Sequence, residues 1–565
     1  MGSKLFLITI PYLLVLVLVL TTLSTQCLAG DLASHKPVSP EILCKSFPDP
    51  PYCISVLPNN TSNIYDYGRF SIKKSLSLSV KFLNLIHRYL SGLSVLSTAA
   101  VRALEDCQLL ASLNTEFLLS SFETVNATNT TLSPFHADRL QTLLSAVITN
   151  LQTCGDGLQT TASAWGVYNE LSVPLTNDTK LSSVSLALFT KAWVPKRNLA
   201  WQPTGRQRVS RLGKMHLHMS SRTRKIYESF SRRNLLQTTE DEVSVYDILV
   251  VSQDGSGNYT TINDAVTAAP TSSNGTNGYF LIYIAAGVYE EYVSIPSNKT
   301  YLMMIGDGIN QTVITGNHSV ADNWTTFSSA TFSVVASNFI AVGITFRNTA
   351  GAIKNQAVAV RNGADLSTFY LCSMEGYQDT LYAHSLRQFY RECDIYGTVD
   401  FIFGNAAVVL QNCNLYPRQP IKGQFNAITA QGRTDLNQNT GTSIHNCTIT
   451  AASDLASSNF TVQTYLGRPW KMYSRTVYMQ TFMDSLINPA GWHVWNDTFA
   501  LSTLYYAEYN NSGPGSNTTN RVTWPGYHVI NATDAVNFTV STFLMGDSWL
   551  PQTGVPYTGG LISCF

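Results

Sequence analysis

Hydrophobic positions recur along this chain with two different spacings. Between about residues 38 and 190 they fall every three to four residues, which predicts helices with one apolar stripe each. The clearest stripes are Leu140, Leu143, Leu144, Val147 and Leu151, and Leu78, Phe82, Leu85, Ile86 and Tyr89. We therefore expect an all-α, four-helix-bundle-like region over 38–190.

From about Val243 the spacing changes to the period of two that is typical of β-strands, with Gly, Asn and Asp between the strands. Typical strands are 281–284, 339–342 and 408–410. A short motif also repeats: Leu371-Cys372-Ser373-Met374 is followed by similar tetrapeptides at Cys393, Cys413 and Cys447. The first two steps are 21 and 20 residues, and the third contains an insertion. This period predicts a solenoid, a right-handed parallel β-helix, over 245–565.

Composition points to an extracellular protein. Only 13% of the residues are charged, and 28 Tyr and 35 Gly suit a β-rich secreted chain. Lys4, the apolar run 5–20 and Cys27-Leu28-Ala29 resemble a signal peptide over 1–29, although the run is also long enough for an uncleaved anchor. Glycosylation triplets are abundant: Asn126, Asn129, Asn177, Asn298, Asn446 and Asn531.

The formal net charge of zero conceals an asymmetry, since basic residues exceed acidic ones by about ten up to residue 237 and the reverse holds beyond it. Much of the excess lies in 191–237. This segment lacks the interleaved aromatics of a nucleic-acid site, so we interpret it as a solvated linker and expect no nucleic-acid partner. Its dibasic pair Arg232-Arg233 is a candidate site for a processing protease.

Four cysteines belong to the helical region. In an oxidising compartment Cys44–Cys53 would close a short loop and Cys107–Cys154 would tie two helices together.

The repeat also places two acids side by side. Asp379 and Asp400 each follow the repeat cysteine, Cys372 or Cys393, by seven residues. Equivalent positions on consecutive coils lie roughly 4.8 Å apart, so the two carboxyl groups should be neighbours on one face of the solenoid.

Three uses of such a pair are open: a shared proton that leaves one carboxyl charged and one neutral, a Ca²⁺ site, or a structural Asp ladder. The amides of Gln378 and Gln356 favour the first, because they can donate to a developing oxyanion. The patch has too few acids for Ca²⁺, and no His/Cys cluster or Gly-x-Ser-x-Gly elbow occurs, so we expect no metal and no cofactor.

Three segments resemble the signatures of plant-type pectin methylesterases: Gly376–Tyr382 (GYQDTLY), Gly397–Asn405 (GTVDFIFGN) and Leu466–Trp470 (LGRPW). The resemblance extends from about residue 245 to the C-terminus. The helical region, with its four cysteines, is similar to the pectin methylesterase inhibitor family. Together they resemble precursors in which an inhibitor-like pro-region precedes a cell-wall esterase.

The resemblance implies roles for individual residues. Asp400 would attack the methyl-ester carbonyl of a galacturonate, and Asp379 would act as acid and then base. Gln378 and Gln356 would stabilise the oxyanion, and Arg468 would hold Asp400 ionised. Substrate binding would involve Thr331, Gln356, Arg468 and Trp470. Sequence does not decide whether Asp400 attacks directly or activates water.

The same resemblance implies a Cys413–Cys447 disulfide and leaves Cys372, Cys393 and Cys564 unassigned. Two departures stand out. Asn355 replaces the basic residue that usually precedes the first glutamine, and Asn234 interrupts the usual basic pair followed by two leucines.

The expected function is hydrolysis of pectin methyl esters by an aspartyl esterase secreted to the cell wall. Its partners would be methylated homogalacturonan, its own pro-region or separate inhibitor proteins, and a processing protease near Arg233. Two alternatives are a polygalacturonase-like glycosidase, which would need a further acid, and an inert wall-binding or inhibitor protein.

Overall fold

A computed structural model describes residues 36–92, 96–195, 216–230 and 242–562. The predicted signal peptide, Arg232-Arg233 and Cys564 lie outside these ranges. No helix in the ranges is both long and apolar enough to cross a membrane.

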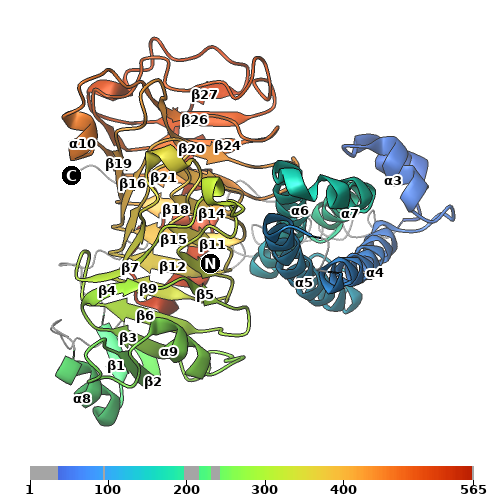
Figure 1. The fold of residues 1–565 in the computed structure, drawn as a ribbon. Coiled ribbons are helices and arrows are strands. Elements are labelled where there is room, and N and C mark those ends of the chain that lie inside the picture. The colour runs from blue at the N-terminus through green and yellow to red at the C-terminus, as the bar shows by residue number, and fades with distance from the viewer. Residues whose placement is uncertain (1–35, 93–95, 196–215, 231–241, 563–565) are drawn as a thin grey trace, which may run out of the picture.

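The N-terminal part is a bundle of four long helices preceded by two short ones (Figure 1). Asn63 and Ser97 cap two of the long helices by accepting a backbone N–H, from Asp66 at 3.0 Å and Ala100 at 3.2 Å. A third begins at Pro134, which needs no intrahelical partner for its nitrogen. The helices are α2 (Pro40–Leu43), α3 (Pro50–Val56), α4 (Ile64–Ser91), α5 (Thr98–Asn126), α6 (Pro134–Thr160) and α7 (Trp165–Ala192).

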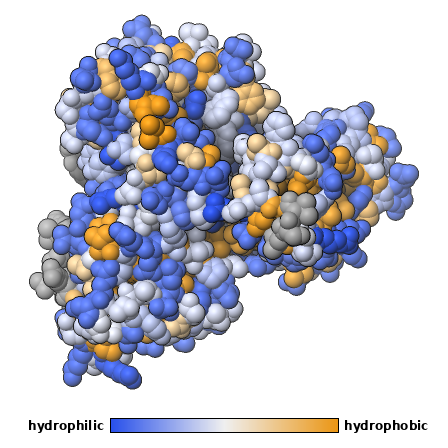
Figure 2. Space-filling view, in the orientation of Figure 1, coloured by the Kyte–Doolittle hydropathy of each residue, from blue (hydrophilic) through white to orange (hydrophobic). Residues whose placement is uncertain are grey.

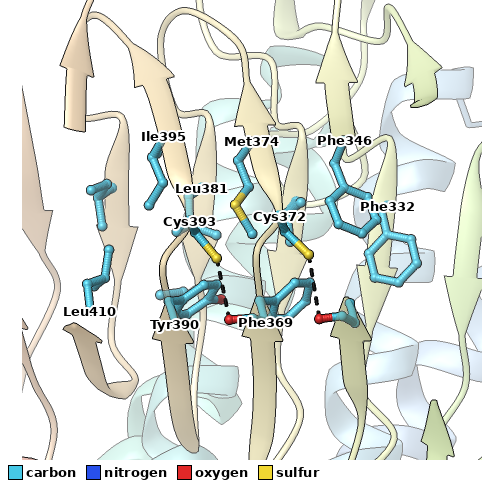
Figure 3. Close-up of a cluster of buried hydrophobic side chains, with 14 of the residues drawn as sticks. Phe332, Phe346, Phe369, Cys372, Met374, Leu381, Tyr390, Cys393, Ile395 and Leu410 are labelled. Carbon is cyan, nitrogen blue, oxygen red and sulfur yellow. Dashed lines mark hydrogen bonds between the residues drawn. The ribbon is translucent and has the colours of Figure 1, made fainter. Parts of the chain in front are cut away.

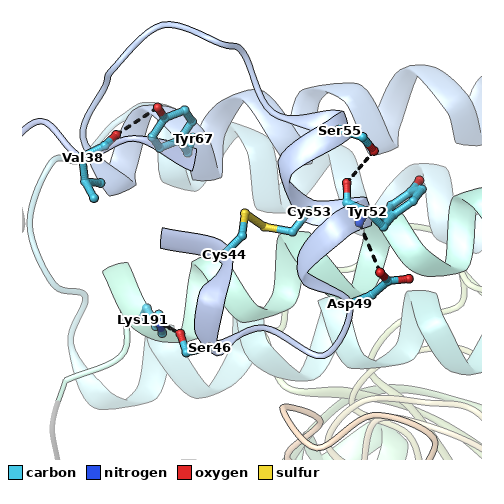
Figure 4. The surroundings of a disulfide bond; sticks show 9 residues. All are labelled: Val38, Cys44, Ser46, Asp49, Tyr52, Cys53, Ser55, Tyr67 and Lys191. Atoms are coloured by element: carbon cyan, nitrogen blue, oxygen red, sulfur yellow. Dashed lines mark hydrogen bonds between the residues drawn. A yellow bond between two sulfur atoms is a disulfide. The ribbon is translucent and has the colours of Figure 1, made fainter. Parts of the chain in front are cut away.

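The predicted stripe on α6 is buried in the core of the bundle, with Leu140 and Val147 each 1% exposed. The two predicted disulfides of this region, Cys44–Cys53 and Cys107–Cys154, are present. Figure 4 shows the first, which joins the residue after α2 to α3, where the side chain of Asp49 accepts the N–H of Tyr52.

The C-terminal part is a parallel β-helix of three sheets, as predicted. The first sheet contains β1 (His216–Met219), β2 (Glu242–Val251), β3 (Tyr279–Ile284), β6 (Leu302–Gly306), β9 (Ile340–Val342), β12 (Ser367–Tyr370), β15 (Arg387–Arg391), β18 (Ala407–Gln411), β21 (Gly441–His445), β24 (Arg475–Met479), β26 (Tyr505–Tyr509) and β27 (Tyr527–Val529). The second contains β4 (Gly287–Glu290), β7 (Thr312–Gly316), β10 (Thr345–Asn348), β13 (Ser373–Glu375), β16 (Asp394–Gly397), β19 (Asn414–Pro417), β22 (Thr448–Ile449) and β25 (Phe482–Met483). The third contains β5 (Val293–Ile295), β8 (Phe332–Val334), β11 (Val360–Asn362), β14 (Leu381–Ala383), β17 (Ile402–Gly404), β20 (Asn426–Gln431) and β23 (Thr464–Gly467).

Short helices flank the coils: α9 (Ile262–Ala268) near the first coils, α10 (Ser453–Ala456) on a later one, and α11 (Ala532–Ala535) and α12 (Val540–Phe543) near the C-terminus. Inside the coils, equivalent side chains stack along the axis. Phe369 and Tyr390, one coil apart, are stacked with ring centroids 5.1 Å apart (Figure 3). Such ladders of buried rings and aliphatic side chains form the core.

The residue before each repeat cysteine turns the chain from the first sheet to the second. Leu371, Glu392, Asn412 and Asn446 all have positive φ, between 51° and 57°. Asparagine tolerates this left-handed conformation better than most residues. The repeat seen in sequence is therefore a repeated corner of the backbone.

Part of the predicted structureless linker is folded, which corrects that expectation for residues 216–230. Strand β1 pairs in parallel with β2, and α8 (Ser221–Phe230) packs on the first coils. Leu217 and Tyr227 are 3% and 1% exposed, and the Tyr227 ring meets Tyr283 edge-on at 5.3 Å. The basic residues of this segment led to the prediction of a solvated linker. The apolar side chains between them instead cover the open end of the first sheet.

The bundle lies against the outer face of the third sheet, near β11 and β14 (Figure 1). Hydrophobic side chains from both parts belong to one buried cluster, which includes Phe327, Tyr382 and Phe403 from the β-helix. Figure 2 shows the two parts in contact in space-filling view.

Candidate active site

Asp379 and Asp400 occupy the same position on consecutive coils. Strands β14 and β17 pair Leu381 with Ile402, and each aspartate lies two residues before its strand. The N–H of Asp379 donates to the carbonyl of Val399 at 3.1 Å, which continues this register. The predicted juxtaposition of the two acids is confirmed.

Both aspartates have left-handed backbones, with φ of 65° at Asp379 and 53° at Asp400. Such a conformation is uncommon for a residue with a side chain and is tolerated best by Asn and Asp. These corners turn the chain from the second sheet into the third and present the carboxyl groups at its edge.

Arg468 binds Asp400 through two hydrogen bonds. Its Nε–H donates to Oδ1 at 2.9 Å and its Nη2–H to Oδ2 at 2.8 Å. The arginine directly follows β23, and its own N–H donates to the carbonyl of Thr429 at 3.0 Å, which fixes its position. The bidentate geometry holds the Asp400 carboxylate ionised and fixes its plane.

Electrostatics separate the two carboxyl groups. Burial and the neighbouring charge of Asp400 raise the pKa of Asp379 well above its ordinary value. Burial also raises the pKa of Asp400, but hydrogen bonding and the positive charge of Arg468 oppose that rise. The pair therefore favours a protonated Asp379 beside an ionised Asp400.

Gln378 and Gln356 flank this pair. Gln378 immediately precedes Asp379, and the N–H of Ala357, next to Gln356, donates to the carbonyl of Gln378 at 3.2 Å. Both side chains are half-buried, and within the described ranges neither amide takes part in a side-chain hydrogen bond. Their N–H groups are thus free to donate to a ligand.

Trp470 is half-buried and follows Arg468 by two residues. Its ring meets Phe403, at the outer face of β17, edge-on at 5.9 Å. A Cβ at Gly432 would lie 2.8 Å from the ring, so glycine leaves the space that Trp470 occupies.

Thr331 directly precedes β8, which lies two strands from β14 in the third sheet. Its side chain is completely buried, and its hydroxyl donates to the carbonyl of Arg347 at 3.2 Å. That bond joins neighbouring parts of the solenoid wall, and a role of Thr331 in substrate binding stays a prediction.

Three aromatic residues near Arg468 were not predicted. Its guanidinium lies 4.3 Å from the centre of the Trp495 ring and 5.4 Å from that of Phe425. His493 stacks on Phe425 at 4.3 Å. The isolated bridge Gly467↔Trp492 puts this segment one coil beyond Arg468. The regular cysteine repeat has ended by that point, so its period could not reveal this neighbourhood.

Comparison with known proteins decides the family. Residues 248–547 match the pectinesterase family, and residues 39–188 match the plant invertase/pectin methylesterase inhibitor family. The chain belongs to the pectinesterase family. It also carries an inhibitor-family domain, and it is therefore a carboxylic ester hydrolase with an inhibitor-like N-terminal region.

Relatives resemble this pectinesterase over nearly its whole length. A probable pectinesterase/pectinesterase inhibitor 20 of Arabidopsis thaliana is 62% identical, over 93% of this chain and 94% of that protein. Pectinesterase 2 of Citrus sinensis is 45% identical, over 96% of this chain and 99% of that protein. The solved structure of pectin methylesterase from carrot is 52% identical, with a TM-score of 0.54, over 58% of this chain and all of that chain.

The cysteine ladder of the pectinesterase carries no disulfide among its four described members, which corrects the predicted Cys413–Cys447 bond. Each thiol donates to a backbone carbonyl one coil away: Cys447 to Leu410 at 3.4 Å and Cys413 to Tyr390 at 3.6 Å. Figure 3 shows the same arrangement at Cys372 and Cys393. Stacked positions project their side chains in parallel into the core, where the backbone N–H of Cys393 also donates to the sulfur of Cys413 at 3.5 Å.

The inhibitor-like domain covers the outer face of the pectinesterase near the aspartates. Asp156 on α6 forms an ion pair with Lys471 at 2.7 Å, and Thr153 is hydrogen-bonded to His384 at 3.0 Å. On α5, the Arg102 guanidinium lies 3.5 Å above the Trp324 ring. Asp379 and Asp400 are only 7% and 5% exposed in this arrangement. Within the described ranges, no group of His, Cys, Asp and Glu is arranged to hold a metal ion.

Proposed function

We propose that this pectinesterase hydrolyses the methyl esters of homogalacturonan with Asp400 as nucleophile and Asp379 as acid and base. The observation that carries the proposal is the two-point contact of Arg468 with Asp400, next to a carboxyl group whose pKa is raised. One group is thus prepared to attack and the other to give up a proton.

In the first half-reaction a carboxylate oxygen of Asp400 attacks the C6 carbonyl carbon. The side-chain N–H groups of Gln378 and Gln356 stabilise the oxyanion. When the intermediate collapses, the bond to the methoxy oxygen breaks and Asp379 protonates that oxygen, which releases methanol and leaves an acyl-enzyme.

In the second half-reaction Asp379, now a carboxylate, takes a proton from water. The resulting hydroxide attacks the acyl carbon, and Asp400 leaves as a carboxylate. The product is a free galacturonate carboxyl group, and Asp379 is protonated again for the next cycle. Trp470 offers an aromatic face to a sugar ring beside the reacting unit.

The test measures the rate of methanol release from methylated pectin by residues 237–565 and by the Asp400→Asn variant of the same segment. Asp254→Asn, which changes a solvent-exposed carboxylate, serves as the control. The carrot enzyme is matched along its full length by 58% of this chain, so a chain of this extent folds alone. We expect Asp400→Asn to lose at least 10²-fold in rate and the control to lose nothing. Equal rates for Asp400→Asn and the parent would refute the assigned nucleophile.

A second measurement separates direct attack from activation of water. A nucleophilic Asp400 forms a mixed anhydride with the substrate, and hydroxylamine that attacks the aspartyl carbonyl of this anhydride should convert Asp400 into a hydroxamate, which peptide mass spectrometry detects. An unmodified Asp400 after turnover in hydroxylamine would assign this residue as a base instead.

We further propose that the chain is exported by a signal peptide at 1–29 and acts in the cell wall. Residues 38–190 would be the pro-region, which occludes the hollow lined by Tyr382, His384, Trp470 and Lys471. Residues 191–237 would be the connection that a protease cuts after Arg232-Arg233. Residues 245–565 would form the enzyme. The occlusion is supported by the Lys471–Asp156 ion pair and the stacking of Arg102 on Trp324. Secretion of Arg232→Ala/Arg233→Ala as an uncut, inactive chain would support this scheme, and normal cutting would contradict it.

A further inference from the structure

Thr380 lies between the two backbone corners that carry the aspartates. It directly follows Asp379 and is completely buried. Its hydroxyl is hydrogen-bonded to the carbonyl of Tyr396 on the next coil at 2.8 Å and to the carbonyl of Tyr377 on its own coil at 3.1 Å. One hydroxyl therefore contacts the backbone shortly before Asp379 and shortly before Asp400.

The same two carbonyl groups also join the corners through the backbone. The N–H of Thr398 donates to the carbonyl of Tyr377 at 2.9 Å, and the N–H of Gly376 donates to that of Tyr396 at 3.3 Å. Thr380 thus lies at the junction where the two corners are hydrogen-bonded to each other. Its hydroxyl adds to the backbone contacts that set the distance between the corners.

Two glycines, one in each corner, leave the space that Thr380 occupies. A Cβ at Gly376 would lie 2.7 Å from the hydroxyl oxygen of Thr380, and a Cβ at Gly397 would lie 2.8 Å from it. A Cβ at Gly397 would also clash with Phe401, the residue that corresponds to Thr380 on the next coil. The glycine that begins each of the two signature segments is therefore needed for close packing of the corners.

Arg418 contacts the same two corners from the solvent side. It directly follows β19, and its backbone N–H donates to the carbonyl of Gly397 at 2.7 Å. Its Nη1–H donates to the carbonyl of Gly376 at 3.0 Å. The guanidinium lies 3.9 Å from the centre of the Tyr377 ring, and an ion pair with Asp454 at 3.1 Å fixes its orientation. One half-buried side chain thus spans both corners.

The corners need this support for two reasons. Both aspartates have a left-handed backbone, with φ of 65° at Asp379 and 53° at Asp400, and such a conformation persists only where the surroundings fix it. The distance between the two carboxyl groups also affects their chemistry. After burial, the charge of Asp400 is the next cause of the raised pKa of Asp379. A looser junction would weaken this effect and would misplace the acid relative to the ester.

We propose that Thr380 and Arg418 are positioning residues that fix the separation of the two catalytic aspartates. The inference rests on the proposed function, because it gives a task to residues around the proposed catalytic pair. Neither residue needs to touch the substrate. Both act through the backbone of the corners, Thr380 from within the solenoid wall and Arg418 from its solvent side.

The experiment measures methanol release by residues 237–565 and their variants between pH 4 and 9. Thr380→Val keeps the shape of the side chain and removes the hydroxyl, whereas Thr380→Ser keeps the hydroxyl. We expect kcat to fall roughly 10- to 100-fold in Thr380→Val with KM within about twofold of the parent, and Thr380→Ser to lose less than about threefold. Because a lower pKa leaves less of Asp379 protonated, the basic limb of the profile should move to lower pH in Thr380→Val.

Arg418→Gln is a second variant at a half-buried position, and it should lower kcat roughly tenfold with the same direction of shift in the basic limb. Thr312→Val and Arg347→Gln are the matched controls. The buried hydroxyl of Thr312 donates to the carbonyl of Ile284 at 3.0 Å between two earlier coils. Arg347, on β10 of the second sheet, pairs with Glu375 at 2.6 Å. Both controls should keep the kcat and the pH profile of the parent.

A titration without substrate separates this inference from the proposed function. The carboxyl ¹³C NMR signal of Asp379, assigned by comparison with Asp379→Asn, should titrate at lower pH in Thr380→Val and in Arg418→Gln than in the parent. This shift in a chain that releases no methanol would support the positioning role and refute the proposed function.

Two results would overturn the positioning role. One is an unchanged titration of Asp379 together with an unchanged basic limb, and the other is a loss in Thr380→Ser as large as that in Thr380→Val. If Thr380→Val fails to fold, the titration of Asp379 in Arg418→Gln decides the matter.

Discussion

Arg468 donates two hydrogen bonds to Asp400, at 2.9 Å and 2.8 Å, from one turn of the solenoid to another. Asp379, on the preceding coil, has no ion pair among the described residues. Two acids in equivalent positions thus have different environments, and the single arginine makes the difference between them.

Replacing Arg468 by lysine should separate charge from geometry. Arg468→Lys keeps a cation but loses the two parallel hydrogen bonds, so we expect kcat to fall roughly 10- to 100-fold with little change in KM. Because Arg468 opposes the rise in the pKa of Asp400, weakening it should move the acidic limb of the pH–rate profile to higher pH. Steady-state kinetics between pH 4 and 9 measure both effects. Arg347→Lys serves as the control, and an unchanged acidic limb would contradict the role of Arg468.

Docking of the inhibitor-like domain should weaken as pH rises. The pKa of Asp106 is raised from 3.8 to about 7 in the docked state. Asp106 therefore keeps a proton in the docked state that it releases in the free domain. The affinity of docking is highest below pH 4 and falls as the pH rises to about 7. The loss approaches tenfold per pH unit in that window.

Calorimetry with residues 38–195 and 237–565 as separate chains, between pH 5 and 8, tests this dependence. Asp106→Asn should remove most of it. Asp178→Asn is the matched control, because burial also raises the pKa of Asp178 to about 7 but on α7, within the bundle. The same slope in Asp106→Asn as in the parent would exclude Asp106 as the responsible group.

The folded piece of the linker should be held by Tyr227. This side chain is 1% exposed and lies against Tyr283, so Tyr227→Ala should cost about 3 kcal/mol of local stability. We expect trypsin to cut α8 roughly 100-fold faster in the variant. Glu228→Ala, an exposed position on the same helix, should behave like the parent. Equal cutting rates in both variants would show that α8 does not depend on this contact.

The stacked cysteines should be chemically free. Alkylation of the unfolded chain without reductant should label Cys413 and Cys447, whereas Cys107 and Cys154 should react only after reduction. Peptide mass spectrometry distinguishes the two sets. A linked pair of peptides containing Cys413 and Cys447 would restore the disulfide that the family resemblance implies.

The register of the catalytic pair was predictable because the solenoid repeats locally. Seven residues separate Cys372 from Asp379 and Cys393 from Asp400. Because consecutive coils have nearly the same length, this equal spacing places the two aspartates at equivalent positions. The helical stripes were predictable for the same reason, since a regular period reflects a regular environment.

What escaped prediction depends on contacts between coils or between domains. Trp495 reaches Arg468 across a stretch without a regular repeat. The hydrogen bond from the Thr331 hydroxyl to the carbonyl of Arg347 is another contact that no local pattern records. The linker strand β1 has too few residues for its alternation to stand out among basic neighbours.

Strand β1 has one more consequence. It lies upstream of the dibasic pair, yet it forms the outermost strand of a sheet whose other members lie downstream. A cut between residues 231 and 241 would therefore leave two polypeptides sharing one sheet, joined by backbone hydrogen bonds and buried side chains rather than by a peptide bond. Severing the chain and separating its pieces would then be distinct events, and the second would have its own rate.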